Sequence, residues 1–120
     1  MDKNILLVDD EKEIVNFLEN FLRRLKLSSL KATSGEEALS MYDKDKIHLV
    51  FLDIQMKGID GLSVLKEIKT RDPEAQVIMI TGKAEKEFQY KAKELGALDY
   101  ITKPLDLGDL REKIHRYLLQ

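Results

Sequence analysis

Five short apolar runs, separated by longer stretches with helical periodicity, constrain the fold of this chain more than any other feature. A short apolar run bounded by loop signals is typical of a strand that helices cover on both faces. The five runs are Ile5–Val8, Ser29–Ala32 (the weakest), His48–Asp53, Gln76–Ile80 and Leu98–Ile101. Regular alternation of strands and helices specifies an α/β fold, with a parallel sheet, right-handed crossovers and helices on both faces.

The intervening stretches carry the start and stop signals of helices. Ser34 and Glu37 form a capping box, in which the hydroxyl and the carboxylate each accept a backbone N–H. Asp60 and Asp106 stand where two further helices begin, and Gly96 stands where a left-handed residue would close another. These local signals predict a helix after every strand.

Length and composition narrow the class of protein. With 120 residues, 43% hydrophobic and 35% charged, the chain has the size and balance of a globular domain, and we expect residues 1–120 to form a single domain. A net charge of -2 favours neither nucleic acid nor an anionic membrane as a partner. The sequence contains no cysteine and no apolar run near 18 residues, so we expect a cytoplasmic protein without a membrane span.

Polar residues follow four of the five runs. Asp9 and Asp10 follow the first, Asp53 ends the third, Thr81 follows the fourth and Lys103 follows the fifth. The carboxyl ends of parallel strands share one edge of the sheet, where ligands bind at the switch point of an open α/β sheet. If strand 2 lies on one side of strand 1 and strands 3, 4 and 5 follow on its other side, strands 1 and 3 become neighbours at that switch point.

Three carboxylates in one crevice need a counter-charge. Two like charges about 4 Å apart repel by roughly 4 kcal/mol at an effective dielectric of 20, so either one carboxylate takes a proton or a cation lies between them. Hard oxygen ligands without histidine or cysteine favour Mg²⁺. A lysine and a hydroxyl opposite such a site suit a phosphoryl group, and the central Asp53 can be the nucleophile that forms an aspartyl phosphate.

Each residue also has a simpler interpretation when it is taken alone. Asp9 or Asp10 could cap the first helix, Thr81 could end a strand, Lys103 could lie in a loop and Asp53 could form a turn. The occurrence of all of them at the same end of different strands favours a common site.

The whole chain resembles the CheY-like receiver domain of two-component response regulators. The motifs that carry the resemblance are Val8-Asp9-Asp10, Leu52–Met56, Asp60-Gly61, Thr81-Gly82 and Tyr100–Pro104. The resemblance implies a flavodoxin-like fold, with five parallel strands in the order 2-1-3-4-5. It also implies a phosphoacceptor that assists its own phosphorylation and dephosphorylation, rather than a conventional enzyme.

By the same resemblance, Asp53 would take phosphate from a sensor histidine kinase or a histidine phosphotransfer protein. Asp10 would bind Mg²⁺ directly, Asp9 partly through water, and the backbone carbonyl of Gln55 would be a further ligand. Exposed residues of the first helix would flank the kinase-docking zone, although they could equally be an ordinary solvated face; they are Glu11, Glu13, Asn16 and Asn20.

The resemblance assigns the remaining residues to phosphoryl binding and to signalling. Thr81 and Lys103 would hold phosphoryl oxygens, and Tyr100 would be the rotating aromatic residue of a switch. The fourth helix, fifth strand and fifth helix would present the switched face to an output domain or protein.

The family usually has a cis bond before its proline, so we expect one at Lys103-Pro104. Lys57 stands where the family commonly has proline, which predicts a looser loop after Asp53.

Four other functions fit the sequence less well. A Mg²⁺-dependent phosphatase similar to the haloacid dehalogenases needs a second acid where this chain has Gln55. A dinucleotide-binding domain needs a Gly-x-Gly turn where it has Asp9-Asp10. A receiver-like scaffold that is never phosphorylated would not need the complete set of phosphoacceptor residues, which this chain has. A histidine phosphotransfer protein needs an exposed histidine on a helical bundle, whereas His48 precedes a strand and His115 is isolated on the last helix.

Overall fold

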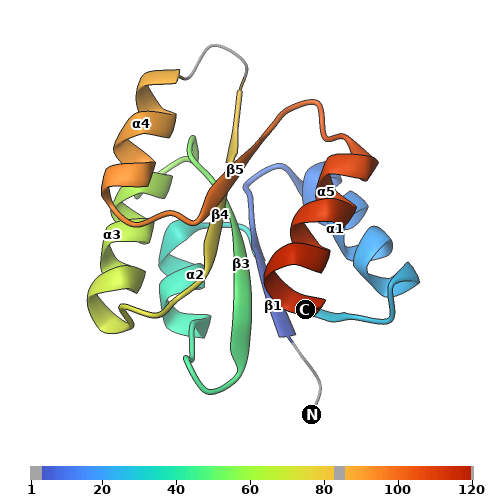
Figure 1. Ribbon diagram of the computed structural model, residues 1–120. Helices are drawn as coiled ribbons and strands as arrows, with labels where there is room; N and C mark the ends of the chain where they lie inside the picture. Colours follow the sequence, from blue (N-terminus) through green and yellow to red (C-terminus); the bar gives the residue numbers. More distant parts are fainter. Residues whose placement is uncertain (1–3, 83–85, 120) are drawn as a thin grey trace.

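The computed structural model describes residues 4–82 and 86–119 and contains a five-stranded parallel sheet in the order β2-β1-β3-β4-β5 (Figure 1). The fold class and strand order expected from the sequence are therefore confirmed. The strands are β1 (Asn4–Val8), β2 (Ser28–Ala32), β3 (Ile47–Asp53), β4 (Val77–Thr81) and β5 (Asp99–Thr102). Every observed end lies within one residue of the predicted run: β1, β2 and β3 begin one residue earlier, and β4 and β5 are displaced by one residue toward the C-terminus.

Helices cover both faces of the sheet. Helices α1 and α5 lie on one side of it, and α2, α3 and α4 lie on the other (Figure 1). The helices are α1 (Lys12–Arg24), α2 (Gly35–Met41), α3 (Gly61–Arg71), α4 (Lys86–Glu94) and α5 (Leu107–Ile114), and α5 continues into a π-helical turn, η1 (His115–Leu119). The π turn has no counterpart in the sequence analysis.

The caps that the sequence predicts are present. The side chains of Ser34, Asp60 and Asp106 each accept a hydrogen bond from the backbone N–H three residues later. The Glu37 carboxylate accepts the N–H of Thr33, so the capping box closes one residue before the cap. Gly96 has a φ of 98°, the left-handed conformation expected after α4.

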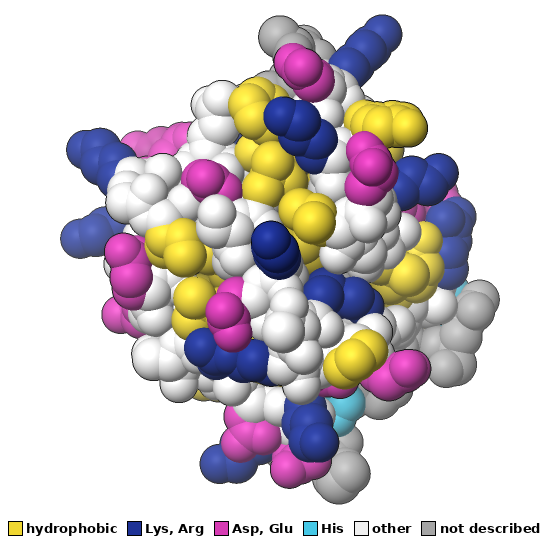
Figure 2. All heavy atoms as spheres, turned by 90° about the vertical axis from the view of Figure 1, so that its left-hand side faces the viewer, with side chains coloured by type: hydrophobic (Ala, Val, Ile, Leu, Met, Phe, Trp, Pro, Cys, Tyr) yellow, Lys and Arg dark blue, Asp and Glu magenta, His cyan; other side chains and the backbone are white. Residues whose placement is uncertain are grey.

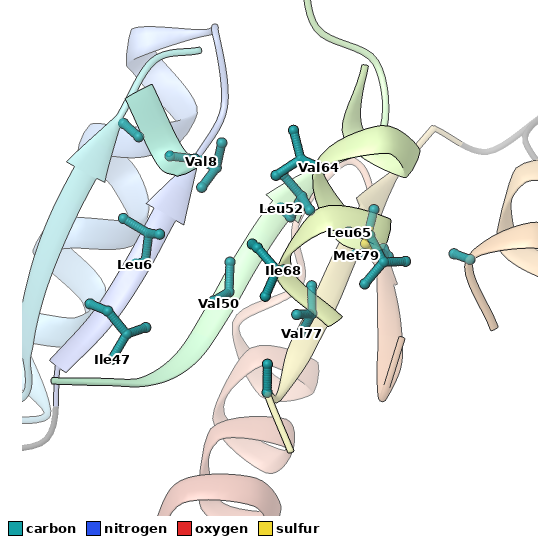
Figure 3. Close-up of a cluster of buried hydrophobic side chains, with 14 of the residues drawn as sticks. Leu6, Val8, Ile47, Val50, Leu52, Val64, Leu65, Ile68, Val77 and Met79 are labelled. Atoms are coloured by element: carbon teal, nitrogen blue, oxygen red, sulfur yellow. The ribbon is translucent and has the colours of Figure 1, made fainter. Parts of the chain in front are cut away.

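Two hydrophobic cores lie on the two faces of the sheet. Successive strand residues point to opposite faces, so Leu6, Val50 and Leu52 face α2 and α3, whereas Leu7 and Phe51 face α1 and α5. Figure 3 shows the first core, with labelled side chains from β1, β3 and β4 and from α3. Both cores are built on the same central strands, which fixes the carboxyl end of β3 firmly in place.

The register of the sheet brings the carboxyl ends of the strands together. Val8 pairs with Leu52, and Asp53 pairs with Ile80. The amino ends of the strands form the opposite edge, where Gln76 donates a hydrogen bond to the His48 carbonyl at 2.9 Å.

Within the described ranges, no helix has the length and apolar character needed to cross a membrane.

Candidate functional site

Asp53 is the last residue of β3 and lies between β1 and β4. Only 4% of its surface is exposed, and its Oδ1 accepts a long hydrogen bond, 3.4 Å, from the backbone N–H of Gln55. The strand that holds it is buried along almost its whole length. This carboxylate is therefore fixed on a rigid element with little water around it.

Asp9 and Asp10 lie beside Asp53. One carboxylate oxygen from each of the three residues falls within 4.8 Å of the others, so this acidic triad can hold a metal ion. Asp9 is 1% exposed, and its Oδ1 accepts the Glu11 N–H at 2.9 Å. Asp9 Oδ2 is buried without a hydrogen-bond partner among the described residues. A buried carboxylate oxygen that accepts no hydrogen bond is stable only with a positive charge nearby.

The side chain of Lys103 supplies positive charge to the triad. Its ammonium nitrogen lies 3.4 Å from Asp9 Oδ2 and 3.5 Å from Asp53 Oδ2. Its shortest ionic contact, 2.9 Å, is to the carboxylate of Glu11. The Lys103 backbone N–H donates to the Thr81 carbonyl at 2.7 Å, and the expected cis bond at Lys103-Pro104 is confirmed.

Burial and mutual repulsion shift the pKa values of these groups. Burial raises the pKa of Asp53 to about 7, and the negative charge of Asp9 adds to the rise while Lys103 opposes it. Burial also raises the pKa of Asp9, against the Glu11 N–H and Lys103. Burial lowers the pKa of Lys103, but the hydrogen bond to Glu11 and the charges of Asp53 and Asp9 outweigh it and leave that pKa above its usual value. The pocket can therefore hold a proton or a cation.

Thr81 is the last residue of β4, and Tyr100 lies within β5. Thr81 is fully buried at the end of β4, one residue beyond the partner of Asp53, and its Oγ1 accepts a hydrogen bond from Gln89 Nε2 at 3.1 Å. Tyr100 lies on β5, and 45% of its surface is exposed. The hydroxyl of Thr81 is therefore bound to α4.

The structure also bears on the start of α1 and on the loop after Asp53. Helix α1 begins after Glu11, whose own side chain makes no capping hydrogen bond, and neither Asp9 nor Asp10 is its N-cap. The Lys57 N–H, which a proline would lack, donates to Asp10 Oδ2 at 3.1 Å. The looser loop expected from the missing proline remains a prediction, and this bond works against it.

Two residues of the site were not recognised as such in the sequence. The sequence suggests only a docking role for Glu11, yet its carboxylate lies beside Lys103. Nothing in the sequence points to Gln89, although its side-chain amide donates a hydrogen bond to the Thr81 hydroxyl. The helical spacing of Gln89 gives no hint of this contact; Glu11 directly follows the Asp9-Asp10 pair, which could have been taken as a signal.

Comparisons with known proteins agree with this geometry. The family model described as the response regulator receiver domain matches residues 5–115. Sporulation initiation phosphotransferase F of Bacillus subtilis (strain 168) is 34% identical over 118 residues, which cover 98% of this chain and 95% of that protein. The receiver domain of NtrX from Brucella abortus superposes with a TM-score of 0.90 and 36% identity, covering 97% of this chain and 98% of that one.

Longer proteins also match. The alkaline phosphatase synthesis transcriptional regulatory protein PhoP of the same Bacillus strain is 35% identical over 118 residues. The match covers 98% of this chain and 49% of PhoP, so the chain spans about half the length of that relative.

Proposed function

Because this chain belongs to the response regulator receiver domain family, a group of phosphoacceptors in two-component signalling rather than conventional enzymes, we propose that Asp53 is the residue that accepts the phosphoryl group. A receiver domain implies a histidine kinase or a phosphotransfer protein as its partner. The proposal rests above all on one observation: the buried Asp53 carboxylate lies within 3.5 Å of the Lys103 ammonium and beside two further carboxylates.

The acceptor reacts as a carboxylate. An oxygen of Asp53 forms a bond to phosphorus while the bond from phosphorus to the donor's histidine nitrogen breaks, and the nitrogen keeps the electron pair. Burial makes this carboxylate poorly solvated and therefore a stronger nucleophile, but it also raises its pKa to about 7. Lys103 favours the ionised form that the reaction needs.

The metal that we propose for the acidic triad is Mg²⁺. Its ligands would be Asp10, Asp53 and the backbone carbonyl of Gln55, with Asp9 partly through water. Asp9 Oδ2, which accepts no hydrogen bond among the described residues, and the all-oxygen donor set fit this ion. When bound, Mg²⁺ would neutralise charge on the carboxylates and on the incoming phosphoryl group.

Thr81 and Lys103 would hold the transferred group. The ammonium of Lys103 is already directed at Asp53, and an ion pair with a phosphoryl oxygen needs only a short movement. The Thr81 hydroxyl would donate to another phosphoryl oxygen and leave its place near α4. We propose that Tyr100 then turns inward, so that the face formed by α4, β5 and α5 changes for its output partner.

The kinase or phosphotransfer protein would dock beside α1. The polar residues that the sequence analysis places there are all exposed, namely Glu11, Glu13, Asn16 and Asn20. Among them Phe17 is 40% exposed, which gives this surface an apolar centre. A polar surface with one exposed aromatic residue suits a transient protein contact.

The test is chemical labelling of Asp53. The purified chain is incubated with acetyl phosphate and Mg²⁺, and the added phosphoryl mass is located by peptide mass analysis. We expect the wild type and Asp45→Asn, an exposed control, to be labelled and Asp53→Asn to remain unlabelled. Labelling of Asp53→Asn to the same extent would overturn the assignment. Continued turnover of a phosphomonoester would instead favour a phosphatase.

A further inference from the structure

The Thr81 hydroxyl makes a contact that a turn of this side chain toward Asp53 would break. Thr81 is fully buried, and its Oγ1 accepts the side-chain amide of Gln89 at 3.1 Å. Gln89 lies on α4, whereas Thr81 ends β4 beside the acidic triad. The bond therefore connects the edge that holds Asp53 with the helix of the proposed output face.

Gln89 also borders the space next to Tyr100. It lines a cavity of about 140 Å³ between α4 and β5, whose walls include Ala92, Leu98 and Tyr100. Ala92 is the buried residue of α4, so this helix is held by little apolar surface. Figure 2 shows the side of the molecule that carries α3 and α4, where hydrophobic side chains alternate with charged ones of both signs. A single half-buried hydrogen bond can therefore influence the position of α4.

We propose that Gln89 is a positioning residue that holds the Thr81 hydroxyl toward α4 in the unphosphorylated protein. The inference rests on the proposed role of Thr81 in binding the phosphoryl group. When Thr81 turns to a phosphoryl oxygen, its bond to Gln89 is lost, and the freed amide lies in the cavity lined by Tyr100. Gln89 thus stabilises the unphosphorylated form and couples the state of Thr81 to α4.

Two substitutions at this position have opposite expected effects. Gln89→Leu cannot donate, so the hydroxyl is free to turn toward Asp53, and phosphorylation becomes faster. Gln89→Glu accepts the one hydroxyl proton of Thr81 and keeps it from the phosphoryl group, so phosphorylation becomes slower. From the usual net contribution of one hydrogen bond, each change is on the order of threefold to tenfold.

The experiment measures the rate of Asp53 labelling by acetyl phosphate with Mg²⁺. It compares wild type, Gln89→Leu and Gln89→Glu, each also in a Thr81→Ala background, with Lys91→Leu as an exposed control on the same helix. We expect Gln89→Leu to be faster and Gln89→Glu slower than wild type, with both differences shrinking to less than about twofold when Thr81 is alanine. Lys91→Leu should match wild type.

Each other outcome has a definite meaning. Changes that persist in the Thr81→Ala background would show that the substitutions act through charge or packing, and would overturn the inference. Equal rates for both Gln89 variants and wild type would also overturn it. Absence of labelling on wild type Asp53 would instead contradict the proposed function, so the two failures are distinguishable.

Discussion

The ammonium group of Lys103 lies 2.9 Å from the carboxylate of Glu11 and 3.5 Å from that of Asp53. In the unphosphorylated protein, its closest ionic partner is thus an exposed residue at the start of α1 rather than the proposed acceptor. A phosphoryl group on Asp53 would have to compete with Glu11 for this lysine.

Replacing Glu11 should make that competition easier. We expect Glu11→Gln to raise the rate of labelling by acetyl phosphate by about twofold to fivefold at low salt, because the ion pair is partly exposed and modest. The free energy of unfolding should change by less than about 1 kcal/mol. Glu13→Gln changes the net charge equally at an exposed position in the first turn of α1 and is the control. An equal acceleration in both variants would attribute the effect to net charge.

Stability in the presence of a chelator should fall as the pH rises. The pKa of Asp53 is about 7 in the folded protein, against an ordinary value of 3.8. Between these values the folded state holds a proton that the unfolded state has released, so the free energy of unfolding decreases with increasing pH. From pH 5 to 8 we expect a loss on the order of 2 kcal/mol, which urea titrations would measure.

The substitution Asp53→Asn isolates the source of this pH dependence. The amide cannot titrate, so the profile of this variant should be flatter and its stability at pH 8 higher than that of wild type. The exposed control Asp45→Asn should keep the wild-type slope. A wild-type slope in Asp53→Asn would mean that other groups, among them Asp9, carry the pH dependence.

Addition of Mg²⁺ at pH 8 should stabilise the protein, because the ion relieves the repulsion within the acidic triad. At a concentration of about 100 times the dissociation constant, the gain is about 2.7 kcal/mol, visible as a rise in the melting temperature. Asp10→Asn removes one proposed ligand and should lose most of this rise. If the rise were the same in Asp10→Asn and wild type, Asp10 would not be a ligand.

Replacing Gly61 by alanine should distort the backbone at the carboxyl end of β3, which holds Asp53. The added Cβ would overlap the carbonyl oxygen of Asp53 and lie 2.7 Å from the Cα of Ile54, so one backbone must move away from the other. We expect Gly61→Ala to cost roughly 2–3 kcal/mol of unfolding free energy and to slow labelling. At Gly108 the Cβ would meet only the carboxylate of Asp106, at 3.2 Å. Gly108→Ala should therefore change stability by less than about 1 kcal/mol.

Lys57→Pro should be destabilising, although proline is common at this place in the family. The ring removes the N–H that donates to Asp10 Oδ2. Loss of this hydrogen bond to a charged group should destabilise the protein by about 1.5–3 kcal/mol. The proline also reduces the conformational entropy of the unfolded chain, which stabilises the folded state by only about 0.4–1 kcal/mol. Lys57→Ala keeps the N–H and should be nearly neutral. Slower hydrogen exchange at residues 54–59 in the proline variant, with a gain in stability, would contradict this expectation.

The sequence predicted those features that arise from local pattern. The caps at Ser34, Asp60 and Asp106 depend on residues three apart, and the strand order follows from the alternation of elements and the family resemblance. The gathering of carboxyl ends at one edge is a property of any parallel sheet, so the approach of Asp9, Asp10 and Lys103 to Asp53 could be foreseen.

The contacts that escaped prediction depend on side-chain conformation between distant residues. Glu11 and Lys103 are 92 positions apart, and their contact requires one rotamer of each long side chain. Gln89 meets Thr81 only because α4 packs in one particular orientation, which periodicity alone does not specify. The π turn η1 is a further example, since its residues have the same apolar spacing as an ordinary helix end.

The distance between the amino and carboxyl ends of the strands has a practical consequence. β3 runs for 7 residues from Ile47 to Asp53, which is about 20 Å of extended chain. A fluorophore or an inserted peptide in the turn at residues 43–46 would therefore sit far from the chemistry. The same scaffold could then serve as an optical biosensor in which the reporter is attached without disturbing what it reports.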